Sequence, residues 1–192
     1  LNHILMQEGM PPLPLAIIRP HVSRGGLALT LLAFELHRSK TEIEPLRLRF
    51  LDYYLHHIAD NSRLFEGFEA VLESLEQQSI AWGVVTNKPG WLTDPLMSEL
   101  KLAGRSAVTI SGDTTAERKP HPLPLITAAQ TIGVRCEQCL YIGDDRRDIV
   151  AGNAANMTTV IARYGYIVDD SDLASWQADR LISHPAQILD LI

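Results

Sequence analysis

Three aspartates, Asp144, Asp145 and Asp148, stand close together directly after a short apolar run. Residues 138–142 are typical of a buried strand and residues 149–151 of a helix, so the three carboxylates are expected in the turn between them. Open α/β sheets bind their ligands at this position, outside the carboxyl ends of the strands. Clustered carboxylates repel one another unless a cation offsets their charge, and Mg²⁺ prefers such oxygen ligands. An acidic helix N-terminus, favoured by the helix dipole, explains the same residues without a metal, so both interpretations stay open.

Thr86 and Asn87 follow another apolar run, residues 80–85, which is also expected to form a strand. A hydroxyl, an amide and free backbone N–H groups just past a buried strand suit the oxygens of a phosphate. The simpler alternative is a turn without chemistry, because Asn and Pro end strands in many proteins.

Lys119 is the third candidate, and it is followed by Pro120. A residue before proline is disfavoured in a helix, so we expect Lys119 in an extended segment. From there its ammonium can reach a neighbouring strand end as a compact charge for phosphate or carboxylate. A solvated surface lysine is the alternative interpretation.

The elements that must position these residues alternate between strands and helices from residue 64 onward. Such alternation predicts βαβ units and a Rossmann-like parallel sheet, so the fold class is α/β. The expected strands are 80–85, 107–110, 138–142, 158–162 and 180–182. The expected helices are 68–77, 91–100, 122–132 and 149–153, with a terminal helix from residue 185.

Residues 1–63 show helical patterns and no convincing strand. Helices are expected at 1–8, 16–21, 27–36 and 44–58. The last of these is amphipathic, with Leu46, Phe50, Tyr53 and Tyr54 as its inward candidates. The chain is therefore divided into an all-helical domain, residues 1–63, and an α/β domain, residues 64–192.

Composition excludes several classes of protein. The 192 residues carry 17 basic and 23 acidic side chains, and the net charge of −6 argues against nucleic acid as the main partner. No apolar run approaches the length of a membrane span, and no signal-peptide pattern is visible, so a cytoplasmic protein is expected. Cys136 and Cys139 form one C-x-x-C without the second ligand pair of a zinc site. We expect no function for them, with a redox dithiol as the alternative.

The order of these motifs resembles the haloacid dehalogenase superfamily of phosphatases. Its second, third and fourth motifs match Thr86-Asn87, the Lys-Pro-x-Pro segment from Lys119, and the Gly-Asp-Asp-x-x-Asp segment from Gly143. Residues 1–63 resemble the helical cap that this family inserts after its first strand. Segments 9–14, 18–23 and 163–166 look like the phosphoglycolate phosphatase branch. Segments 64–67, 82–89 and 163–166 are also similar to the N-acetylmuramic acid 6-phosphate phosphatases.

The resemblance implies a role for each candidate. Thr86 would bind the transferring phosphoryl group through its hydroxyl, with help from the backbone N–H of Asn87. Lys119 would neutralise phosphate charge. Asp144, and with it Asp145, would hold Mg²⁺, while Asp148 would orient the ligands.

In the cap, Ser23, Arg24 and Gly25 match the loop that closes over the substrate. Arg19 is a further candidate for an anionic substrate, with a surface ion pair as its alternative. The implied partner is a small phosphorylated acid or sugar, either 2-phosphoglycolate or N-acetylmuramic acid 6-phosphate, bound by a monomer or homodimer. A phosphosugar mutase is less favoured, because nothing in the cap specifically indicates it.

The family's first motif, Asp-x-Asp-Gly-Thr, is absent from this sequence. In the family its first Asp is the nucleophile that forms an aspartyl-phosphate and its second is the general acid/base. Its strand is central, between the strand that ends at Thr86 and the strand that ends at Gly143. Without it, both neighbours are expected to present unpaired edges. Three explanations stay open: the segment lies upstream of the given sequence, it is truncated, or a swapped segment fills its place. We hypothesise a truncation and expect the chain as given to be inactive.

Two rival classes stay open. One is a non-catalytic remnant that binds phosphate or metal, or serves as a structural partner in an assembly. The other is a receiver-like domain, which also combines clustered acids, a Thr and a Lys on a parallel sheet. The helical block before the sheet argues against a receiver, and so does an acidic cluster that follows a late strand.

Overall fold

The computed structural model describes residues 1–167 and 172–192, without the side chain of Lys40. The chain forms two units, Leu1–Asp60 and Asn61–Ile192, which divide close to the predicted boundary after residue 63. Within the described residues, none of the helices has the length and apolar character needed to cross a bilayer.

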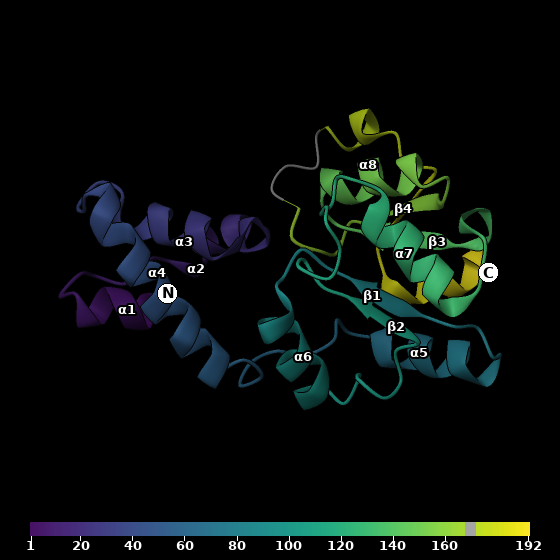
Figure 1. Cartoon of the computed structure of the whole chain (residues 1–192), viewed down its shortest axis with the longest axis horizontal. Coiled ribbons are helices and arrows are strands. Elements are labelled where there is room, and N and C mark those ends of the chain that lie inside the picture. The colour runs from purple at the N-terminus through teal and green to yellow at the C-terminus, as the bar shows by residue number, and fades with distance from the viewer. Residues whose placement is uncertain (168–171) are drawn as a thin grey trace. The chain divides into compact units, whose positions relative to one another are not determined.

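The first unit is all-helical (Figure 1). Its elements are α1 (Asn2–Gln7), α2 (Leu15–Ile18), the 3₁₀ helix η1 (Arg19–Arg24), α3 (Gly25–Phe34) and α4 (Lys40–His56). Apolar side chains from these helices meet in one cluster that includes Ile4, Leu5, Phe34, Leu46 and Phe50. The predicted inward residues Leu46 and Phe50 are buried, and Tyr53 packs against the cluster.

Helix α4 begins earlier than its predicted start at residue 44, because a capping box closes its first turn. The Glu42 carboxylate accepts the backbone N–H of Ser39 at 2.9 Å and the Ser39 hydroxyl at 2.6 Å. These bonds satisfy backbone groups that a helix start otherwise leaves without partners. The apolar periodicity alone gives no signal for this polar first turn.

The second unit is an α/β domain in which every strand pairing is parallel, as predicted. Its strands are β1 (Gly83–Val85), β2 (Val108–Ile110), β3 (Leu140–Gly143), β4 (Thr158–Ala162) and β5 (Arg180–Ile182). Its helices are α5 (Phe68–Gln77), α6 (Gly90–Glu99), α7 (Leu123–Ile132) and α8 (Arg146–Ala154), with 3₁₀ helices η2 (Cys136–Gln138), η3 (Leu173–Trp176) and η4 (Pro185–Leu191).

Helices pack on both faces of these strands (Figure 1). Helix α5 contributes Val71 and Leu72 to a cluster with Val160 of β4. Helices α7 and α8 form a second cluster that contains Leu125 and Ala151. A parallel sheet covered on both faces is the expected arrangement for βαβ units, since each crossover helix lies on one face.

The strands form two sheets, β1–β2 and β3–β4–β5. Val85 lies in register with Ile110, and Ile142 with Val160. In the described residues, β1 has a ladder only with β2, and β3 has one only with β4. The edges of β1 and β3 that lack a strand partner are joined through a side chain, because the Tyr141 hydroxyl donates to the Val85 carbonyl at 3.2 Å.

The predicted strand before Gly143 and the predicted terminal helix also differ from the structure. The strand predicted from residue 138 begins at Leu140, because Cys136–Gln138 form a 3₁₀ turn. The terminal helix from Pro185 is a 3₁₀ helix. Cys136 and Cys139 are free thiols beside the α7–α8 cluster. Burial raises the pKa of Cys139, which disfavours its reactive thiolate form.

Candidate active site

The three predicted motifs meet at the ammonium group of Lys119. Its Nζ donates to the Val85 carbonyl at 2.7 Å, at the end of β1. It also donates to the Tyr141 hydroxyl at 2.8 Å and lies 2.9 Å from Oδ1 of Asp148. The side chains of Lys119 and Asp148 are only 9% and 8% exposed. The structure therefore joins the end of β1, the segment before α7 and the acidic turn after β3 in one charged cluster.

Tyr141 belongs to this cluster although no sequence pattern singled it out. It lies on β3, and its hydroxyl accepts from Lys119 and donates to Val85. Burial, followed by the charges of Asp148 and Asp144, raises the pKa of Tyr141 well above its ordinary value. The group therefore stays a neutral hydroxyl at neutral pH and keeps its donor proton.

Asn87 holds the backbone of Lys119 from both sides. Its Oδ1 accepts the Lys119 N–H at 3.1 Å, and its Nδ2 donates to the Lys119 carbonyl at 2.9 Å. This side-chain role was not predicted, since the sequence indicated only a backbone donor at Asn87. Lys119 lies outside a helix as expected, but in a turn with a cis bond to Pro120 and not in an extended segment. The two hydrogen bonds from the Asn87 side chain hold the backbone of Lys119 in this turn.

Thr86 stands at the first position after β1, where the chain turns. Its backbone N–H donates to the Ile110 carbonyl at 2.8 Å, and its hydroxyl accepts the Lys88 N–H at 3.1 Å. Gly112, in the loop after β2, lies very close to this turn. A Cβ on Gly112 would lie 2.3 Å from the Asn87 carbonyl oxygen. A side chain at that position is therefore incompatible with the observed approach of the two loops.

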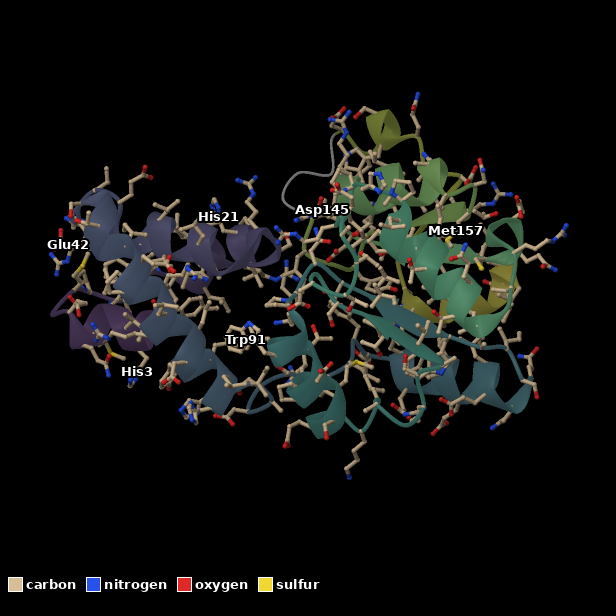
Figure 2. All side chains as sticks on the ribbon, in the orientation of Figure 1. His3, His21, Glu42, Trp91, Asp145 and Met157 are labelled. Atoms are coloured by element: carbon tan, nitrogen blue, oxygen red, sulfur yellow. The ribbon has the colours of Figure 1, made fainter. Side chains whose placement is uncertain are left out.

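Asp145, which is labelled in Figure 2, is the N-cap residue of α8. Its Oδ1 accepts the Arg147 backbone N–H at 3.0 Å, and its Oδ2 pairs with the Arg147 guanidinium at 2.5 Å. Burial acts to raise the pKa of Asp145, but these bonds from Arg147 outweigh it and leave the pKa below its ordinary value. The helix-terminus interpretation thus describes the contacts of Asp145.

Asp148 contacts both the helix start and the lysine. Its Oδ2 accepts the backbone N–H of Asp145 at 3.1 Å, which completes the capping box, while its Oδ1 faces Lys119. Gly143 makes this geometry possible, because a Cβ there would lie 2.3 Å from the Asp148 Cβ.

Asp144 is held by the segment that follows β4. Its Oδ2 accepts the backbone N–H of Tyr166 at 2.7 Å. A Cβ on Gly165 would lie 2.3 Å from the Asp144 Cβ, so only glycine permits this approach. Burial, and after it the charge of Asp144, raises the pKa of Tyr164 to about 12. In the sequence, the only indication of the contact between Asp144 and Tyr166 is Gly165, which stands between two tyrosines after a predicted strand.

The carboxylates of the acidic turn differ in how well they suit Mg²⁺. In the part of the chain that the structure describes, no three His, Cys, Asp or Glu side chains gather as a ready metal cage. Mg²⁺ does not need one, because it takes one or two carboxylates and completes its shell with water and phosphate oxygens. The Asp144 carboxylate fits that requirement, whereas both oxygens of Asp145 are engaged by Arg147.

The predicted substrate-binding residues of the cap lie in the first unit. Arg19, Ser23 and Arg24 belong to η1, and Gly25 is the first residue of α3. Gly25 has φ +86°, a conformation that residues with a side chain rarely adopt. The contact of these four residues with a substrate stays a prediction.

Comparison with known proteins gives consistent matches. A family profile described as haloacid dehalogenase-like hydrolase matches residues 3–162. The chain is 46% identical over 188 residues to a phosphoglycolate phosphatase of Xanthomonas campestris pv. campestris (strain 8004), covering 98% of this chain and 85% of that protein. It is 40% identical over 185 residues to an N-acetylmuramic acid 6-phosphate phosphatase of Pseudomonas aeruginosa, covering 96% and 82%. The crystal structure of a predicted phosphoglycolate phosphatase from Haemophilus somnus 129pt superposes with a TM-score of 0.87 at 25% identity, covering 99% and 87%.

Proposed function

This chain belongs to the haloacid dehalogenase-like hydrolase family, within its phosphatases, and on that premise we propose that it serves Mg²⁺-dependent hydrolysis of a small phosphate monoester. The proposed substrate is a phosphorylated acid or sugar. The two relatives named above support 2-phosphoglycolate and N-acetylmuramic acid 6-phosphate as the compounds to compare.

The observation that carries the proposal is the cluster around Lys119. A nearly buried ammonium lies 2.9 Å from a nearly buried carboxylate at the carboxyl ends of two parallel strands. A buried charge pair of this kind is costly to form, so it is not expected from stability alone. Phosphoryl transfer relies mainly on positioned charge, which such a cluster provides.

Each residue of the site has a proposed role in this hydrolysis. The Thr86 hydroxyl and the Asn87 backbone N–H bind phosphate oxygens, and Lys119 neutralises their charge. Asp148 holds the lysine through the ion pair seen in the structure. Asp144 is the proposed Mg²⁺ ligand, and the bound ion would neutralise further charge on the phosphate oxygens.

The nucleophile is proposed to be an aspartate on a strand that pairs between β1 and β3. Its carboxylate oxygen would attack phosphorus, the ester P–O bond would break, and the leaving alkoxide would take up a proton from the second aspartate of the same motif. Water would then cleave the acyl phosphate and regenerate the carboxylate. The edges of β1 and β3 that have no strand partner in the described residues support this position. The sequence as given holds no Asp-x-Asp-Gly-Thr segment, so no turnover is expected from it alone.

A chromogenic phosphate ester tests the proposal. The chain as given is compared with a fusion that carries an Asp-x-Asp-Gly-Thr strand ahead of Leu1, each with and without Mg²⁺. Turnover by the fusion only, and only with Mg²⁺, is expected. In the fusion, Lys119→Gln is expected to lower kcat/KM by about 10²- to 10³-fold. The exposed Lys101 offers a matched control, since Lys101→Gln should leave kcat/KM unchanged.

The competing proposal is a non-catalytic protein that retains only phosphate binding. The lack of an Asp-x-Asp-Gly-Thr segment in the sequence as given supports it, because the residues that could bind phosphate are present without a nucleophile. A well-folded fusion without turnover on any tested ester would support this second proposal.

A further inference from the structure

Phe65 stands in the segment before α5, and its ring contacts the two tyrosines that flank Gly165. The centroid of the Phe65 ring lies 5.2 Å from that of Tyr164, in an edge-to-face arrangement, and 6.2 Å from that of Tyr166, in a tilted one. Aromatic rings at such separations and angles attract each other beyond the burial of apolar area. Phe65 therefore connects the start of α5 to the segment that follows β4.

The segment 164–166 is also the one that holds Asp144. The Tyr166 backbone N–H donates to Oδ2 of Asp144 at 2.7 Å. Gly165 lies directly against the same side chain, since a Cβ on Gly165 would overlap the Asp144 carboxylate. Segment 164–166 thus contacts Asp144 through its backbone and Phe65 through its two rings.

Phe65 is suited to act as a fixed support, because its neighbours in the chain are anchored. The side chains of Leu64 and Phe68 pack against the apolar cluster between α5 and β4. The Phe65 carbonyl accepts the Phe68 N–H at 3.0 Å, which ties its backbone to the start of α5. The Phe65 side chain itself is 38% exposed, so little of the apolar core depends on it.

The segment that Phe65 supports is anchored on both sides of an adjustable peptide. Tyr164 packs against the α5 cluster, Ile167 packs against a separate cluster, and the Gly165 N–H donates to the Ala162 carbonyl at 3.0 Å. Between these anchors, Gly165 has more backbone freedom than any residue with a side chain. A ring contact that fixes Tyr166 therefore also fixes the direction of the Tyr166 N–H.

We propose that Phe65 is a positioning residue for the binding of Mg²⁺ at Asp144. Its ring fixes Tyr166, and the Tyr166 N–H holds the Asp144 carboxylate in one orientation. Groups that hydrogen-bond to a ligating carboxylate typically change metal affinity by about 10- to 100-fold when they are lost. The inference rests on the proposed role of Asp144 as a Mg²⁺ ligand and adds the residue that orients this ligand.

Phe65→Ala tests the first step without a metal. An amide proton that is donated to a carboxylate resonates downfield and exchanges slowly with solvent, and both are expected for Tyr166 in the Mg²⁺-free wild type. In Phe65→Ala the Tyr166 amide resonance should move upfield, and its protection against hydrogen exchange should fall by at least about fivefold. Phe65→Tyr keeps the ring and should restore both properties. A folded Phe65→Ala protein with the Tyr166 amide of the wild type would overturn the inference.

The affinity for Mg²⁺ tests the second step. In a Mg²⁺ titration followed through the amide signals of Asp144 and Tyr166, Phe65→Ala should weaken binding by about three- to tenfold. This loss is smaller than that for a direct partner of the carboxylate, because Phe65 acts through Tyr166. Val134→Ala is the matched control, since it shortens a side chain of similar exposure, 37% against 38%, and should leave Mg²⁺ affinity unchanged. Equal losses in the two variants would contradict a specific role for Phe65.

A double variant tests whether Phe65 acts through Tyr166. Tyr166→Ala should also weaken Mg²⁺ binding, and the addition of Phe65→Ala should cause no further loss, because the two rings form one support. Losses that simply add would show that the two residues act independently and would overturn the proposed route.

Asp144→Asn separates the inference from the proposed function. If the wild type binds no Mg²⁺, or Asp144→Asn binds it as tightly as the wild type, the proposed role of Asp144 fails and the inference with it. If Asp144→Asn weakens Mg²⁺ binding and Phe65→Ala does not, only the inference fails.

Discussion

At the scale of single residues, the candidate site depends on contacts between parts of the chain that are distant in sequence. The bonds of Lys119 to Val85 and Tyr141 join residues that are 34 and 22 positions apart. The Asn87 side chain reaches Lys119 across 32 positions. The geometry of the lysine is therefore set by tertiary structure, and each of these contacts is testable alone.

Asn87→Ala is expected to destabilise the fold and the site together. It removes the acceptor for the Lys119 N–H and the donor to the Lys119 carbonyl. Loss of both bonds should lower the free energy of unfolding, measured with urea, by about 1–3 kcal/mol. Phosphate affinity should fall as well, because the Lys119 backbone is no longer held.

Asn2 provides a matched control for that experiment. Its side chain makes the same pair of bonds to the backbone of Leu13, at 3.0 and 2.9 Å, in the helical unit. Asn2→Ala should therefore reduce stability by a similar amount and leave phosphate affinity unchanged. Equal losses of phosphate affinity in both variants would contradict a specific role for Asn87.

Residue type and position within an element selected Lys119 and Asp148 as site residues, and the structure pairs their side chains at 2.9 Å. Their roles in catalysis stay predictions. The sequence patterns missed Tyr141 and the side-chain role of Asn87, because nothing in their local sequence shows which distant group they meet. The Tyr166 N–H that holds Asp144 was missed for the same reason.

At the scale of elements, the turn from β3 into α8 depends on a glycine. Gly143→Ala would place a Cβ 2.3 Å from the Asp148 Cβ and 2.5 Å from its Oδ2. Because Asp148 also caps α8 and pairs with Lys119, it cannot move without loss of those bonds. The free energy of unfolding should fall by about 1–3 kcal/mol.

Gly104→Ala is the control for the glycine substitution. A Cβ at Gly104 meets no atom within 4 Å, so its effect on the free energy of unfolding should stay within about 0.5 kcal/mol. Thermal or urea unfolding of both variants makes the comparison. A Gly143→Ala protein as stable as Gly104→Ala would show that the turn relaxes easily.

Element types were predicted well from periodicity, and element ends less well. Helix α5 and strands β4 and β5 have the predicted bounds. Strand β1 begins at Gly83 and not at residue 80, and α4 starts earlier because of the Ser39–Glu42 capping box. These ends are fixed by single hydrogen bonds and by strand partners, which hydrophobic periodicity does not encode.

At the scale of the whole molecule, the sheets of the second unit have an internal discontinuity. Strand β4 pairs on both sides, with β3 and β5, and its residues Thr159 and Val160 are fully buried. Strand β1 has one strand partner in the described residues, and its Gly83 is exposed. The two sheets are joined at Val85, whose carbonyl accepts hydrogen bonds from the Lys119 and Tyr141 side chains. These side-chain bonds do not form a backbone ladder between the sheets.

Hydrogen exchange should show this difference directly. Amide protons of β4 are expected to exchange slowest, while peptides that cover β1 exchange much faster, because open edges allow local unfolding. In the fusion that carries an added strand, exchange in β1 and β3 should slow by at least about tenfold, since new ladder bonds protect both edges. Exchange in β4 should change little, because both of its edges are already paired. If β1 is as protected as β4 without the added strand, side-chain bonds alone close the sheet, and the space between β1 and β3 is not a strand position.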